Sequence, residues 1–182
     1  MVAWELTRGL QPMRPLKLLL AAACAATAMP CFAAPVAPAQ PATGRALLLV
    51  PLKLTKISDL SFGTIVPSPV SGAVFINATT GARTAIGGVT GVASDPGSRA
   101  YFATAGSPGQ QVIVAVNQPI ALTSPAGDTI TVLALTLDGP NTRTIDPVTR
   151  NFFFGIGGII LVGADQPEGL YEATFDVTAT YL

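Results

Sequence analysis

The final stretch of the chain has the clearest alternation of apolar and polar residues. Polar residues separate four apolar ones there at a period of two: Phe175, Val177, Ala179 and Tyr181. Because successive side chains of a strand point to opposite faces, this pattern predicts a half-buried strand with one apolar side against a core. We expect no later strand from this molecule, so a partner for its second edge must come from earlier in the chain or from another chain.

Similar alternating segments occur along most of the preceding chain. They predict strands at residues 45–57, 60–66, 73–77, 83–86, 99–103, 112–116, 129–138, 151–154 and 158–163, with a weaker continuation at 120–122. Turns rich in Gly and Pro separate them, and we expect a hairpin loop at residues 77–81. No helical period is visible. The prediction is an all-β fold, an antiparallel immunoglobulin-like β-sandwich that is either complete or, as in pilins, lacks one strand.

The strand predicted at residues 129–138 changes phase midway. Its apolar residues lie on two faces, with Ile130 and Val132 on one and Leu133, Leu135 and Leu137 on the other. A bulge near Val132 or Leu133 would bring both sets to one core, and the alternative is a strand that crosses between two sheets.

Phe152, Phe153 and Phe154 stand in a row and cannot all face one core. We therefore expect at least one of them to be exposed or to contact a partner.

Residues 1–33 are predicted to be a signal peptide. Arg14 and Lys17 precede a short apolar run that ends at Met29, and small residues occupy the positions that a signal peptidase requires for cleavage after Ala33. The protein is therefore expected to be secreted.

The order of segments along the chain follows from this signal. Met1 and Met13 are both candidate starts, since a start at Met13 gives a compact signal. Pro30 interrupts the apolar run, which is too short to cross a membrane, so we expect no membrane span in the mature chain. A Pro/Ala-rich extension is predicted at residues 34–44 and the β-sandwich domain at 45–182.

Composition narrows the chemistry of the mature chain. Cys24 and Cys31 fall within the signal, and the sequence contains no histidine. The signal holds three of the ten basic and one of the ten acidic residues, which leaves seven and nine, a net charge of −2. So small a charge argues against nucleic acid as a partner. We expect no enzyme activity, no cofactor and no metal, and the carboxylates of residues 165–176 are predicted to be a solvated face.

Two separated segments resemble the signatures of a bacterial secreted family known as domain of unknown function family 4402. The opening segment is LSFGTIVP at residues 60–67, followed by Gly72 and by residues 80–83 and 87–89. The closing segment is LVGADQPEGLY at residues 161–171, followed by 175–178 and Tyr181. Together they cover residues 52–182. The resemblance implies a secreted domain and no particular activity.

The last strand also resembles the C-terminal motif of pilin subunits assembled by the chaperone–usher route. That motif has a glycine fourteenth from the end and a tyrosine second from the end, and Gly169 and Tyr181 stand at these places. In such subunits a periplasmic chaperone lends a missing strand, and the N-terminal extension of the next subunit replaces it in the fibre. The resemblance implies strand pairing with a chaperone or a subunit through six residues: Gly169, Tyr171, Phe175, Val177, Ala179 and Tyr181.

The predicted extension departs from the pilin pattern. Residues 34–44 offer only Val36 and several alanines between prolines, whereas residues 45–54 alternate better and form the stronger donor by pattern. Pilins also usually contain a disulfide, which the mature chain cannot form.

Two functions are compatible with these patterns. We expect a structural subunit that passes through the periplasm to the cell surface, with a chaperone and an usher as partners, and self-assembles by strand complementation. The alternative is a self-complete secreted binding module or coat component, for carbohydrate or surface adhesion, in which the final strand is an ordinary edge strand.

Overall fold

The computed structural model describes residues 40–182. The predicted signal peptide, its cleavage site at Ala33 and most of the predicted extension lie outside the described residues. Residues 40–45 have no regular secondary structure, and a compact unit comprises Ala46–Leu182. Within the described range no helix is long and apolar enough to cross a membrane.

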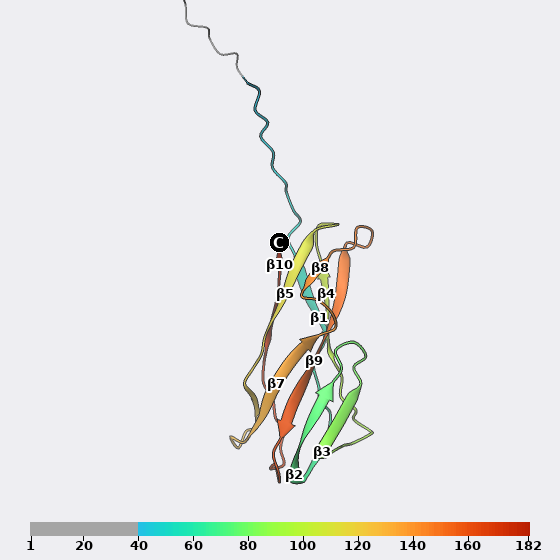
Figure 1. Cartoon of the computed structure of the whole chain (residues 1–182), viewed down its shortest axis with the longest axis vertical. Helices are drawn as coiled ribbons and strands as arrows, with labels where there is room; N and C mark the ends of the chain where they lie inside the picture. Colours follow the sequence, from blue (N-terminus) through green and yellow to red (C-terminus); the bar gives the residue numbers. More distant parts are fainter. Residues whose placement is uncertain (1–39) are drawn as a thin grey trace, which may run out of the picture. The chain divides into compact units, whose positions relative to one another are not determined.

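The compact unit is built from ten strands (Figure 1). Their bounds are β1 Lys53–Ser58, β2 Ile65–Ile76, β3 Arg83–Gly91, β4 Ala100–Ala105, β5 Gln111–Asn117, β6 Ala121–Thr123, β7 Thr129–Leu137, β8 Thr142–Thr144, β9 Asn151–Val162 and β10 Asp176–Tyr181. All pairings between them are antiparallel.

The strands form two sheets. The first has seven strands in the order β1-β4-β9-β2-β3, with β7 paired to β9 and β6 paired to β7. The second has three strands in the order β10-β5-β8. Figure 1 shows the second sheet at the upper end, near β1 and β4, with β2, β3 and β7 toward the lower end. The predicted all-β antiparallel sandwich is confirmed, while its immunoglobulin-like character stays a prediction.

Two core clusters fill the sandwich. In the upper one, Phe102 and Phe154 of the first sheet pack with Val114 of the second. The lower one is centred on Val74 and Ile160, and its other buried members also come from the first sheet or the segments around it. Strands of the second sheet therefore cover only the upper half of the first sheet.

Strand β9 is continuous where the sequence predicted two separate strands. The predicted break at residues 155–157 is wrong, because both glycines there lie within the strand. A Cβ atom at Gly155 would collide with the carbonyl oxygen of Ala78, and one at Gly157 with that of Ile76. Glycine therefore permits the close approach of the neighbouring backbone without interrupting the strand.

Other predicted boundaries also shift. The first strand begins at Lys53, not at residue 45, and β2 runs through the Pro67–Pro69 turn predicted from the sequence, with a register shift between Pro67 and Gly72. The strand predicted at residues 83–86 continues through its following glycines to Gly91 as β3, and the short strand β8 was not predicted. The predicted hairpin loop at residues 77–81 is confirmed, with the side chain of Asn77 accepting hydrogen bonds from two backbone amides.

The predicted bulge in β7 is confirmed by a register shift between Val132 and Ala134. Gln118 fills the irregularity: its side-chain amide donates to the carbonyls of Val132 and Leu133, and its Oε1 accepts from the amide of Leu135 at 3.0 Å. Polar groups freed by the bulge are thereby satisfied.

Arg83 holds together the segments that open the domain. Its guanidinium donates to the backbone carbonyls of Phe62, Thr64, Val92 and Asp95 over 2.7 to 3.2 Å. A Cβ atom at Gly91 would collide with this guanidinium, so the glycine provides its space. These contacts explain why the LSFGTIVP segment and Arg83 belong to one motif, because Arg83 donates to the carbonyls of Phe62 and Thr64 within that segment.

Candidate functional site: a groove beside the final strand

The structure places the six predicted pairing residues in two settings. Val177, Ala179 and Tyr181 belong to β10, which pairs with β5 from Asp176 opposite Asn117 to Tyr181 opposite Val112. Phe175 directly precedes the strand and packs against the upper core together with Val177. Gly169 and Tyr171 lie earlier, in the segment that connects β9 to β10.

Strand β10 has one paired and one unpaired edge. Within residues 40–182 its only strand partner is β5, and likewise β1 pairs only with β4. Both strands flank the same core, since Leu54 of β1 and Val177 of β10 pack against the upper cluster. An unpaired strand edge presents free amide and carbonyl groups, which is the template for adding another strand.

Tyr181 holds the end of β10 close to the segment that precedes β1. Its hydroxyl donates to the carbonyl of Val50 at 2.7 Å and accepts from the amide of Ser107 at 2.7 Å. The hydroxyl of Ser107 in turn accepts from the amide of Val50 at 2.7 Å. The three residues therefore tie the end of β10 to the segment just before β1. The pattern of the sequence gives no signal for Ser107 or Val50, because their partners are 57 and more residues away.

An apolar cleft continues from the other end of the space between β10 and β1. It has a volume of about 880 Å³ and lies between the segment after β1 and the segment before β10. Leu60 and Phe175 mark these two segments, and Ile130, Val132 and Ile160 from the lower core line the cleft. Connecting segments flank the lower half of the sandwich in place of paired strands, so the cleft leads to the apolar core of the domain.

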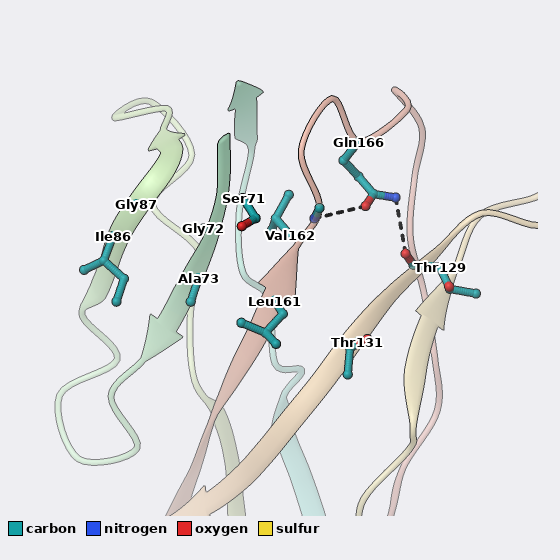
Figure 2. Close-up of a pocket in the computed structure, with 11 residues that line it drawn as sticks. Ser71, Gly72, Ala73, Ile86, Gly87, Thr129, Thr131, Leu161, Val162 and Gln166 are labelled. Atoms are coloured by element: carbon teal, nitrogen blue, oxygen red, sulfur yellow. Dashed lines mark hydrogen bonds between the residues drawn. The ribbon is translucent and has the colours of Figure 1, made fainter. Parts of the chain in front are cut away.

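The wall before β10 is held by its own hydrogen bonds. Gln166 accepts from the amide of Gly163 at 3.2 Å and donates to the carbonyl of Thr129 and the hydroxyl of Tyr171, as Figure 2 shows for its first two bonds. Tyr171 donates to the carbonyl of Pro167 at 2.8 Å. These contacts hold the QPEGLY segment in place as one wall of the cleft. They also place Tyr171 against the lower core.

The rim of the cleft is acidic. Four carboxylates line it, from Asp59, Asp95, Glu168 and Glu172, and no Lys or Arg side chain is among its lining residues. Lys56 contacts Asp59 at 2.6 Å, but both side chains are largely exposed, so this pair leaves most of the acidic character in place. Among residues 40–182 no cluster of His, Cys, Asp and Glu could hold a metal ion.

The segment just before β1 exposes apolar side chains. Leu47 and Leu48 are 75% and 89% exposed, and Val50 is 51% exposed. None of these residues is part of a strand, because β1 begins only at Lys53. The chain thus has both an apolar cleft and, just before β1, a segment with exposed apolar side chains.

Comparison with known proteins gives one match. The model of the family described as "Domain of unknown function (DUF4402)" matches residues 52–181. No curated protein and no solved structure matches the chain. The matched range includes the Arg83 contacts, the Gln166 wall and strand β10, and the chain therefore belongs to the DUF4402 family.

Proposed function

We propose that the protein is a secreted structural subunit of the cell surface that assembles by β-strand complementation. The observation behind this proposal is the unpaired edge of β10 next to an apolar cleft. A strand added there would bond to the free backbone groups of β10 and cover apolar residues with its own side chains. Each large apolar side chain removed from water stabilises such a complex by about 1.5 to 3 kcal/mol.

The proposed occupant is the N-terminal segment of a second copy, residues 34–49. Val50 is bound to Ser107 and Tyr181 of its own chain, and Lys53 and Leu54 pair with β4, so residues 45–54 are not free as a whole and the available segment ends at Leu49. Stretched out, these residues reach about 50 Å, whereas the six residues of β10 span about 20 Å. The segment is therefore long enough to follow the whole edge and enter the cleft.

Charge also favours this occupant. Arg45 is the only charged side chain of residues 34–49, and signal cleavage would add a positive terminal amine. The acidic rim of the cleft offers opposite charge to both groups. A periplasmic chaperone covering the same edge would keep it from pairing prematurely during transit to the surface.

The test is export of a variant in which residues 34–49 are replaced by an equally long Gly/Ser sequence behind the unchanged signal peptide. We expect surface polymers from the native protein and none from the Gly/Ser variant, with circular dichroism showing the same folded domain in both. Polymers of undiminished length from the Gly/Ser variant would refute the proposed donor. Genes for a periplasmic chaperone and an outer-membrane usher are expected beside this one.

A self-complete binding module is the second candidate, because of an aromatic row on the outer face of the first sheet. The rings of Tyr101 and Phe153 stack with centroids 5.9 Å apart, and the guanidinium of Arg99 lies 4.6 Å from the Tyr101 centroid. Phe153 is 48% exposed, which confirms the prediction that one of the three phenylalanines would be. An aromatic row with an adjacent cation suits an acidic sugar. Binding of acidic polysaccharide that Phe153→Ser abolishes would support this candidate, and equal binding by both proteins would exclude it.

A further inference from the structure

The lower outer face of the first sheet, formed by β2, β3, β7 and β9, is apolar and uncovered within residues 40–182. Ile160 and Val162 of β9 point into the lower core, so their neighbours Ile159 and Leu161 point outward. Leu161 is 41% exposed, Ile86 of β3 is 51% exposed and Leu133 of β7 is 49% exposed. Strand β9 is thus apolar on both faces, which is typical of a strand with a covering layer on each side.

Outward residues on the four strands form two continuous cross-strand rows. The register places Ile86, Ala73, Leu161 and Thr131 in one row. It places Thr84, Phe75, Ile159 and Ala134 in the next. Figure 2 shows the first row across four neighbouring strands. Adjacent residues in such rows lie within contact distance, so the exposed apolar groups form one surface and not isolated positions.

This surface has no charged group. Strands β2, β7 and β9 contain no charged residue, and β3 contains only Arg83. The guanidinium of Arg83 is directed to the backbone carbonyls of the opening segments and bonds to four of them. A charged partner would therefore gain no electrostatic attraction here, whereas an uncharged apolar partner would not have to bury a charge.

The surface also has relief. A hollow of about 560 Å³ is lined by Gly72, Ala73 and Gly87, and the side chains of Ile86 and Leu161 also line it (Figure 2). Glycine is required at the floor, because a Cβ atom at Gly87 would lie 2.8 Å from the carbonyl oxygen of Ser71. Exposed side chains beside a hollow allow two such faces to interdigitate, as packed sheets do.

We propose that this face packs against the same face of a second copy and forms a two-sheet contact between subunits. The four strands lie side by side over about five residues, from Gly72 to Ile76 in β2 and from Gly158 to Val162 in β9, and with strands about 4.8 Å apart this patch is roughly 300 Å² in projection. Its accessible surface exceeds the projection but stays below the roughly 800 Å² per partner of a standard specific interface, so the contact is of the weak, reversible kind. Strand β10 belongs to the other sheet and takes no part in this contact, although Val162 and Gln166 line both the hollow and the cleft.

Sedimentation velocity of the Gly/Ser-segment variant tests this contact without the proposed donor segment. We expect a dimer that dissociates at low concentration. Adding Ile86→Lys and Leu161→Lys should weaken dimerisation by at least about a hundredfold, because buried ammonium groups would lack partners. The matched control is Val148→Lys, an 85% exposed loop position, which should leave the dimer intact.

A charge-reversal experiment distinguishes a direct contact from damage to the fold. The Ile86→Glu and Leu161→Glu protein should also be monomeric, and an equimolar mixture with the Lys protein should form dimers again. Circular dichroism would verify that both proteins fold. A monomer at all concentrations, a dimer that both Lys substitutions leave unchanged, or binding of the face to lipid vesicles in place of dimerisation would each overturn the proposal. None of these outcomes depends on whether the N-terminal segment complements β10.

Discussion

The hydroxyl of Tyr181 donates a hydrogen bond to the carbonyl of Val50 at 2.7 Å, and so joins the last strand to the residues that precede the first. The same hydroxyl accepts from the amide of Ser107. This junction closes one end of the space between β10 and β1. The apolar cleft with its acidic rim opens at the other end. It also divides the N-terminal part of the chain into a held portion from Val50 onward and an exposed portion before it.

Replacement of Tyr181 by Phe tests this junction. The variant keeps the ring and removes both hydrogen bonds of the hydroxyl, so we expect a loss of about 1 to 2 kcal/mol in the free energy of unfolding, measured by urea denaturation. Tyr171→Phe is a matched control for the loss of a tyrosine hydroxyl, because the hydroxyl of Tyr171 bonds only within the wall of the cleft and not to the segment before β1. Unchanged protection of the Val50 amide in hydrogen exchange would contradict the role given to Tyr181.

Arg83→Lys should destabilise the domain although the charge is kept. An ammonium group cannot reach four carbonyls that a planar guanidinium contacts at once, and each lost charge-assisted bond contributes about 1.5 to 3 kcal/mol. Thermal unfolding would measure the effect. Arg150→Lys, at an exposed position, is the control and should be neutral. Equal stability of the two variants would mean that the Arg83 contacts contribute little.

Thr104→Val is expected to stabilise the protein. Thr104 is 0% exposed, and its hydroxyl has no hydrogen-bond partner. A methyl group of nearly the same shape removes the cost of burying that hydroxyl, which is worth about 1 to 3 kcal/mol. Thr104→Ser retains the hydroxyl, loses a methyl group and should destabilise. A higher denaturation midpoint for Thr104→Val is the expected result, and a lower one would indicate that the hydroxyl is satisfied.

Asp146 should make stability depend on acid pH. Backbone hydrogen bonds from Thr149 and Val148 lower the pKa of its carboxyl in the folded protein. A folded-state pKa below the unfolded one gives a contribution that is fully present above the unfolded value and is lost as pH falls through the folded value. Asp146→Asn keeps the acceptor oxygen without the charge. Its thermal midpoint should therefore fall less than that of the native protein below about pH 4, and parallel curves would contradict this.

Local patterns predicted those parts of the fold that depend on neighbouring residues. The phase change in residues 129–138 predicted a bulge because the side-chain period of a strand is two, and the loop beginning at Asn77 followed from turn chemistry. The resemblance to the DUF4402 family was confirmed over residues 52–181. The six predicted pairing residues stay predictions, although their positions are now known.

What the patterns could not predict depends on contacts between distant segments. The glycines of β9 look like a break in the sequence, and only the nearby carbonyls of Ile76 and Ala78 explain them. The bonds of Arg83 to the segments on either side of it, and the approach of Val50 to Tyr181, have no periodic signature. The cleft likewise forms between two connecting segments that are far apart in the sequence, and the four carboxylates of its acidic rim come from three segments of the chain.

The most direct test of strand complementation is hydrogen exchange of the mature protein with a synthetic peptide of residues 34–49. The native peptide should slow exchange of the β10 amides that do not bond to β5 and of the segment before β10, whereas a control peptide with Leu47→Asp and Leu49→Asp should not. A stable monomer whose β10 exchanges equally with either peptide, or with none, would contradict the account.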